Sequence, residues 1–464
     1  MRPLLAALAL SSCLFFTVAA EASGKHKKPN FLFLLVDDLG WADLACYGSS
    51  FHETPHLDQL ARDGVRFTDA YAAASICSPT RASLMTGKHP VRVDITDWIP
   101  GTGSKDRKLI TPRDSHQLAL EEVTIAEALR DGGYSTFYTG KWHLGPKAFG
   151  PDRQGFEQYH DPYRDPSRGS PGRGTKTGRK HATGDLTRET KKFITAHREG
   201  PFFAYLSYYD VHTPIIAEKK YQAHYAEKAS KLGPPPRAIP ERDGRSRPRQ
   251  DNAALATMVQ TVDDSVGELV AHLDSLGILE NTYIFFFSDN GGLCTKKSVG
   301  PGCNLPLRAS KGWLYEGGIR VPLIIRQPGR KHAGAQPREY VCSTDIYPTL
   351  LELAGLPPRP EQHVDGCSFI NLLIGAEPRK NPRPLYWHYP HYHGSTWAPG
   401  AAIRDGDWKL IEFYHHGTFE LYNLREDLGE QNNLASRFPG RARDLRQRLK
   451  TWQQEMGARM PLVR

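Results

Sequence analysis

The stretch Cys-Ser-Pro-Thr-Arg-Ala-Ser-Leu-Met-Thr-Gly, from Cys77 to Gly87, constrains this chain more than any other part of it. Pro79 suits the first turn of a helix, residues 81–85 are predicted to continue it, and Gly87 can end it in the left-handed conformation. Because first-turn amide groups and the helix dipole attract negative charge, we expect an electropositive pocket at Cys77, with its thiol pKa lowered. Arg81 adds a fixed positive charge there. A buried cysteine at the start of a helix is the alternative interpretation.

Charged and amide side chains directly follow three of the predicted buried strands. They are Asp37 and Asp38 after residues 30–36, Lys141 and His143 after residues 136–139, and Asp289 and Asn290 after residues 283–287. Ligands of open α/β sheets bind at the carboxyl ends of the strands, so we expect these side chains to share one site. Each pair taken alone is also typical of a turn, a helix cap or an ordinary surface group.

Strands alternate with helices over most of the chain. Helices are predicted at 55–63, 124–130, 254–276 and 345–354, and further buried strands at 202–208 and 321–325. This alternation predicts an α/β fold with a large, mixed but mostly parallel sheet sandwiched by helices. Residues 160–181 and 231–249 are predicted to be long surface loops.

The pattern changes beyond a polar segment at 375–384 that contains three prolines. The tripeptide 405–407, Asp-Gly-Asp, predicts a hairpin turn, residues 419–422 a further strand, and residues 441–456 a helix. We therefore expect a smaller C-terminal α+β domain with an antiparallel sheet. The predicted organisation is a signal peptide at 1–22, a catalytic domain at 23–378 and a C-terminal α+β subdomain at 379–464.

The N-terminal segment combines a charged Arg2, an apolar run at 4–18 and small residues up to Ala22. This combination is typical of a secretory signal, so we expect the protein to be exported, either periplasmic or secreted. A lipoprotein anchored at Cys13 is the less favoured alternative, because the apolar run continues beyond that cysteine. No other stretch predicts stable membrane insertion.

The net charge of +9 favours a polyanionic partner such as a sulfated glycan. Nucleic acid is not an expected partner, since the basic residues are scattered or lie in loops without an aromatic ladder beside them. A hydrophobic content of 39% and a charged content of 24% fit a soluble globular enzyme.

Export permits disulfide bonds among the remaining cysteines. Cys294 with Cys303 and Cys342 with Cys367 are candidate pairs, which would leave Cys46 unpaired. Spacing alone leaves this pairing open.

The run Cys77-x-Pro79-x-Arg81, followed by Ala-Ser-Leu-Met-Thr-Gly, resembles the signature of the type I sulfatases, in the alkaline phosphatase superfamily. The resemblance extends along most of the chain, with its motifs in family order. It implies an alkaline phosphatase-like fold and oxidation of Cys77 to Cα-formylglycine by a formylglycine-generating or maturase enzyme. It also implies one calcium ion per chain, held by the residue at position 77 together with Asp37, Asp38, Asp289 and Asn290. All of these offer oxygen ligands, as a hard cation requires.

The resemblance also assigns catalytic roles. The matching positions are Cys77, Arg81, Lys141, His143, His212 and Lys311. One hydroxyl of the aldehyde hydrate would attack sulfur, helped by the metal and Asp289, while the three cations neutralise charge on the sulfuryl oxygens. His212, with Lys311 close by, would protonate the leaving alcohol, and His143 would take the proton of the second hydroxyl as sulfate is eliminated.

The implied function is hydrolysis of sulfate esters with release of inorganic sulfate, on a sulfated carbohydrate or an aryl sulfate. The segment 387–394 and the hairpin at Trp408 also resemble carbohydrate-directed bacterial sulfatases. His388, His391 and His393 are candidate substrate-binding residues, since aromatic and imidazole rings suit sugar recognition near a domain interface. The alternative is that they are packing residues at the domain junction.

Other functions are compatible with the same residues. A phosphate or phosphonate ester hydrolase of the same superfamily would share the fold and the formylglycine. A non-catalytic glycan-binding relative would need a lost ligand or nucleophile, and none of the matched positions is lost. A thiol enzyme that uses unmodified Cys77 is the remaining alternative.

Overall fold

The computed structural model describes residues 28–103, 105, 107–163, 182–375 and 383–464. The predicted signal peptide with Cys13, most of the predicted loop at 160–181 and the predicted boundary at 378/379 lie outside these residues. Among the residues described, no helix combines the length and apolar character needed to cross a bilayer.

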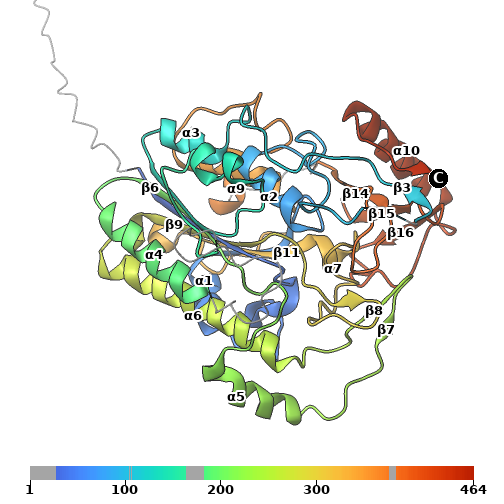
Figure 1. Ribbon diagram of the computed structural model, residues 1–464, viewed down its shortest axis with the longest axis horizontal. Coiled ribbons are helices and arrows are strands. Elements are labelled where there is room, and N and C mark those ends of the chain that lie inside the picture. The colour runs from blue at the N-terminus through green and yellow to red at the C-terminus, as the bar shows by residue number, and fades with distance from the viewer. Residues whose placement is uncertain (1–27, 104, 106, 164–181, 376–382) are drawn as a thin grey trace, which may run out of the picture.

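An eight-stranded sheet lies at the centre of the molecule (Figure 1). In spatial order its strands are β12 (Val341–Cys342), β2 (Val65–Tyr71), β11 (Arg320–Arg326), β9 (Thr282–Ser288), β1 (Asn30–Val36), β6 (Phe202–Ser207), β4 (Ser135–Gly140) and β5 (Gln158–His160). Only β11 runs against its neighbours, β2 and β9, so the predicted mixed, mostly parallel sheet is confirmed. Every residue of β1 is buried, as expected of a strand covered on both faces.

Helices cover both faces of this sheet (Figure 1). One face carries α2 (Cys77–Thr86), α3 (Ile125–Asp131), α8 (Ile346–Leu353) and α9 (Ile370–Leu373). The other carries α1 (Pro55–Asp63), α4 (Thr183–Ala196) and α6 (Ala253–Ser275), with α5 (Lys219–Ser230) packed on α6.

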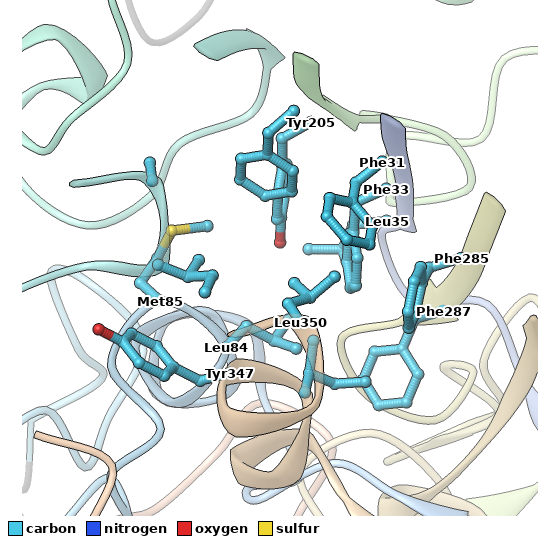
Figure 2. Close-up of a cluster of buried hydrophobic side chains, with 14 of the residues drawn as sticks. Phe31, Phe33, Leu35, Leu84, Met85, Tyr205, Phe285, Phe287, Tyr347 and Leu350 are labelled. Atoms are coloured by element: carbon cyan, nitrogen blue, oxygen red, sulfur yellow. The ribbon is translucent and has the colours of Figure 1, made fainter. Parts of the chain in front are cut away.

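Alternate residues of β1 belong to the two hydrophobic layers. Phe33 and Leu35 lie on the α2 side, where Figure 2 shows them near Leu84 and Leu350. Leu34 points to the opposite layer. This two-sided burial holds the carboxyl end of β1 rigidly in place.

The C-terminal part forms a four-stranded antiparallel sheet, as predicted. Its strands are β13 (Leu385–Tyr389), β14 (Gly400–Asp405), β15 (Trp408–Phe413) and β16 (Thr418–Asn423). The helix α10 (Pro439–Glu455) covers one face. Trp387 and Phe413 on the other face pack in one cluster with Trp313 and Tyr315 of the larger part.

Short elements complete the described chain. The short strands are β3 (Leu109–Ile110), β7 (Ile239–Pro240), β8 (Arg245–Ser246), β10 (Thr295–Lys296) and β17 (Leu462–Val463), and the short α-helix is α7 (Glu316–Ile319). Short 3-10 helices lie at Trp41–Asp43, Ala45–Tyr47, Lys147–Phe149, Pro151–Arg153, Leu279–Asn281, Pro328–Arg330 and Ser343–Asp345. The segment 231–249, predicted as a loop, contributes β7 and β8 to a three-stranded sheet with β10. Two-residue strands are too short to show a period-two pattern, and β10 pairs with the distant β8, so local sequence does not reveal them.

The expected disulfide pairs are wrong in this structure. All six cysteines of the described residues are free thiols. Cys294 instead donates a hydrogen bond from its Sγ to the carbonyl oxygen of Ala309, at 2.9 Å. Cys342 and Cys367 are likewise unpaired.

Candidate active site

The acidic residues of the site follow two neighbouring parallel strands. Val36 at the end of β1 pairs with Ser288 at the end of β9, which places the residues after them side by side. Asp38 has a left-handed backbone, with φ of 63°, and its amide donates to Oδ1 of Asp289 at 3.2 Å. The sequence prediction that both strand ends meet in one site is therefore confirmed in geometry.

The helix α2 begins at Cys77, two residues before Pro79, the predicted first helical position. It ends at Thr86, and Gly87, with φ of 68°, is the expected left-handed cap. Cys77 is buried at the start of this helix, and its Sγ lies 3.3 Å from Oδ1 of Asp37. Burial raises the pKa of the thiol, and Asp289 and Asp37 raise it further. The expected lowering of this pKa is thus wrong, because burial and then the two nearby carboxylates disfavour the thiolate.

Each cation of the site is paired with one carboxylate. Arg81 contacts Asp289 through Nη2 at 2.7 Å, and Lys141 forms an ion pair with Asp37. Lys311 lies 2.6 Å from Oδ1 of Asp38. Lys311 Nζ also lies 3.3 Å from Sγ of Cys77.

These pairs determine the ionisation of the acidic residues. Burial opposes ionisation of Asp37, but Lys141 and other cations hold its pKa well below the ordinary value. The pKa of Asp38 is also lowered, since Lys311 and its neighbours outweigh burial. Burial and the charge of Asp37 raise the pKa of Asp289 to about 6. Proximity of three carboxylates thus makes the last of them hard to ionise without an added cation.

Two imidazole rings border the same space. His143 has Nε2 at 2.7 Å from the carbonyl oxygen of Ile99, so Nε2 carries the proton, and its buried Nδ1 has no hydrogen-bond partner among the described residues. Burial and Lys141 lower its pKa well below 6.5, so the ring is neutral. His212 has Nε2 at 3.7 Å from Oδ2 of Asp38, and burial and Lys311 lower its pKa to about 4.

The donor set fits a hard divalent cation. Asp37, Asp38, Cys77 and His212 each offer an atom within 4.8 Å of the others. Asn290 donates from Nδ2 to Asp38 at 2.8 Å, whereas its buried Oδ1 has no partner among the described residues. A buried amide oxygen without a donor is costly unless a ligand occupies it, and carboxylate and amide oxygens are the preferred ligands of calcium.

A cavity of about 420 Å³ opens beside these groups. Its lining residues are Cys77, Trp98, Thr102, His143, His212, Thr213, Leu293, Lys296, Lys311, His393, Gly394 and Ser395. Sequence reasoning missed Trp98, Thr102 and Lys296, because no motif surrounds them and only the fold brings their segments to the cavity.

The three candidate substrate histidines have different surroundings. His393 lines the cavity, and its Nδ1 lies 2.7 Å from Oγ of Ser395. His388 is buried against α10, with Nε2 at 3.1 Å from the carbonyl oxygen of Arg459. His391 has Nε2 at 2.8 Å from Oγ1 of Thr96 and borders a separate hollow. His388 and His391 therefore do not line the cavity; β13 ends at Tyr389, and the chain beyond it turns so that His391 and His393 face different hollows.

Comparison with known proteins agrees with this geometry. The family profile described as Sulfatase matches residues 29–356, and that described as N-sulphoglucosamine sulphohydrolase, C-terminal, matches residues 309–456. A sulfatase of Formosa agariphila is 31% identical over 92% of this chain and 89% of its own length. Human arylsulfatase A is 32% identical over 92% of this chain and 87% of its own length. Human N-acetylgalactosamine-6-sulfatase is 32% identical over 81% of this chain and 70% of its own length.

Solved structures show the same fold. The structure described as Ps i-CgsB has a TM-score of 0.74 and 28% identity, covering 92% of this chain and 93% of its own. A phosphonate monoester hydrolase of Agrobacterium radiobacter, at 22% identity and a TM-score of 0.67 over 94% of this chain and 100% of its own, shares the fold. On the profile match and the full-length relatives, the chain belongs to the sulfatase family and is a sulfuric ester hydrolase.

Proposed function

We propose that this protein hydrolyses sulfate esters of carbohydrates, using a Cα-formylglycine formed from Cys77 and a calcium ion, and releases inorganic sulfate. The observation that carries the proposal is the position of Cys77. Its Sγ lies 3.3 Å from both Asp37 and Lys311, at the wall of the cavity. A reactive group at position 77 would face the substrate in the cavity on one side and the buried charged side chains on the other.

The thiol itself is poorly suited to the reaction. Because burial and carboxylates raise its pKa, little thiolate forms at neutral pH, and thiolate is the nucleophilic form of cysteine. Oxidation of position 77 to formylglycine supplies a hydrated aldehyde, one hydroxyl of which can attack sulfur while the other allows sulfate to leave by elimination.

The residues that would hold calcium are Asp37, Asp38, Asp289 and Asn290, which directly follow the paired ends of β1 and β9. The ion supplies positive charge beside the reacting group and a Lewis acid for a sulfuryl oxygen. Asn290 orients Asp38 through its amide group and keeps its own Oδ1 unoccupied by protein.

The three cations stabilise the negative charge of the sulfuryl group. Lys141 and Lys311 are held by Asp37 and Asp38, and Arg81 is fixed by Asp289 and by the carbonyl oxygen of Lys141 at 2.7 Å. Because these partners fix the cations before substrate binds, little reorganisation is needed in the transition state.

Two groups move protons. His212, whose ring is neutral near neutral pH, would pass to the leaving alcohol a proton supplied by the charged Lys311; both residues contact Asp38 and line the cavity. His143 holds its Nε2 proton against Ile99 and leaves Nδ1 as the acceptor, which suits the base that takes a proton during release of sulfate.

A carbohydrate is the substrate class that this proposal favours. Structural neighbours include Ps i-CgsB in complex with k-i-k-neocarrahexaose, at 28% identity, and human N-acetylgalactosamine-6-sulfatase is 32% identical over 81% of this chain. Trp98 and His393 give the cavity of this chain an indole and an imidazole ring, which suit contacts with a sugar. We also retain export to the periplasm or medium as part of the proposal, since that is where such glycans are met.

The test is side-by-side turnover by the purified enzyme. The panel contains an aryl sulfate, the matching aryl phosphate and phosphonate, and sulfated mono- and oligosaccharides. Sulfate release from sugars at rates above the phosphorus esters is the expected result. Faster turnover of the phosphorus esters would instead establish the phosphate or phosphonate hydrolase, and strong aryl sulfate turnover with no sulfate from any sugar would reject the carbohydrate substrate.

A further inference from the structure

Lys296 lines the active-site cavity but belongs to none of the motifs described above. It ends β10, where it pairs with Arg245 of β8, so its backbone is fixed by a small sheet. The side chain is half-buried. Its charge is close enough to His393, another lining residue, to help lower the pKa of that ring to about 3, after the larger effects of burial and Lys311. Lys296 therefore faces the same space as the reacting groups.

Lys296 differs from the other cations of the cavity in having no partner charge. Lys311 is paired with Asp38, and the two cations behind the cavity wall, Arg81 and Lys141, are paired with Asp289 and Asp37. No hydrogen bond or ion pair joins the Lys296 ammonium group to a carboxylate within the described ranges of the chain. A half-buried ammonium group without a counter-charge is stabilised when an anionic ligand enters.

We propose that Lys296 recognises a second anionic group of the substrate, a sulfate or a carboxylate, other than the sulfate ester that is cleaved. The proposal rests on the proposed function and deepens it, because it selects polyanionic glycans over singly sulfated ones. The cations around Cys77 would bind the sulfate that is cleaved, whereas Lys296 lies on the part of the cavity wall that also contains His393 and Ser395. An ammonium group suits this role because it is a point charge that accepts anions in several orientations.

The experiment compares galactose monosulfates with galactose disulfates in which the second sulfate occupies each remaining position, and with a monosulfated disaccharide that carries a uronate. The readouts are kcat/KM from sulfate release by the mature enzyme, and dissociation constants from calorimetry in a Cys77→Ala background, which do not depend on turnover. At least one doubly anionic member is expected to be preferred over its monosulfated parent. Lys296→Gln should reduce that preference by about ten- to thirtyfold.

Two matched variants complete the test. Lys296→Arg keeps the charge and should retain most of the preference, and Lys297→Gln, at the exposed neighbouring position, should retain all of it. The preference should also weaken as salt concentration rises. The proposal is overturned if no doubly anionic ligand is preferred, or if the preference survives Lys296→Gln. Failure to release sulfate from any ester, with the binding preference intact, would overturn only the proposed function.

Discussion

Lys311 and Cys77 lie 234 positions apart in the sequence, yet Nζ of Lys311 is 3.3 Å from Sγ of Cys77. The same ammonium group contacts Asp38, so it is fixed between a carboxylate and the reacting position. Burial disfavours its charge, but Asp38 and Cys77 raise the pKa of Lys311 overall, and it stays protonated.

Removal of this cation should therefore affect chemistry more than folding. Lys311→Ala is expected to lower kcat/KM for an aryl sulfate by about 10²- to 10³-fold, the typical effect of losing one preorganised charge from an active site. Thermal unfolding followed by circular dichroism should remain cooperative. Activity within a few fold of the unmodified enzyme would show that Lys311 has no catalytic role.

Position 77 should carry the modification in active enzyme. Mass spectrometry of the peptide that contains Cys77 should show the loss of the thiol and the mass of an aldehyde or its hydrate. Cys77→Ala should abolish turnover while the fold remains intact, because the side chain contributes little to the core. A fully active sample with only free thiol at this position would contradict the mechanism.

Calcium should be bound through the amide oxygen of Asn290. Asn290→Leu replaces the amide with an apolar group of similar size and changes no charge, so we expect loss of bound metal and of activity together. Metal content measured by plasma mass spectrometry, and restoration of chelated enzyme by calcium, are the two readouts. Asn432→Leu, the same substitution at an exposed position away from the site, is the matched control. Full activity after exhaustive chelation would refute the metal assignment.

A buried charge network joins the two sheets and should control stability. Lys409 of β15 is fully buried, with Nζ at 2.8 Å from Glu316 and 2.9 Å from Glu430. Lys409→Met leaves two buried carboxylates without their cation, so we expect a loss of about 3–5 kcal/mol in the free energy of unfolding. Lys450→Met, at an exposed position of α10, should change it little. Chemical denaturation of both variants checks the difference, and equal effects would contradict it.

Glu430 should make stability depend on pH. Burial raises its pKa to about 7 despite Lys409, above the ordinary value of 4.5. The folded protein therefore binds this proton more tightly than the unfolded chain does, and the resulting stability is complete below about pH 4.5 and decreases as pH rises towards 7. Glu430→Gln mimics the protonated form and should remove this decrease.

The measurement is the difference in unfolding free energy between Glu430→Gln and the original protein across that pH range. The variant should gain relative stability as pH rises, and the difference reports the titration of Glu430 together with its effect on the neighbouring Glu316. A constant difference would show that the carboxyl group titrates at an ordinary pKa.

Some features were determined by local sequence. The apolar run at 30–36 predicted β1 at its observed bounds, and Pro55 and Gly64 enclosed α1 as expected. Asp37 and Asp289 directly follow two of the predicted strands, which predicted one shared site. Neighbouring parallel strands bring their carboxyl ends together at the same edge of the sheet. Periodicity and end signals are local properties, and burial on both faces of the sheet reinforces them.

The ionisation of the site was decided by tertiary structure alone. The helix start at Cys77 predicted a lowered thiol pKa, whereas burial with Asp289 and Asp37 beside it raises that pKa. Electrostatic effects depend on distances between segments remote in sequence, such as those that carry Lys311 and Asp38. A sequence pattern shows which charged residues are present, but it does not give the distances between them in the folded chain.

The residues that line the cavity likewise could not be identified from the sequence. His388, His391 and His393 form one cluster in the chain, yet only His393 lines the cavity, because the segment leaves β13 and turns after Tyr389. Lys296 reaches the same cavity from a two-residue strand whose partner lies some fifty residues earlier. The sequence by itself determined the long strands of the central sheet and the acidic cluster at their ends; the folded chain decided which side chains line the cavity, since that depends on packing between distant segments.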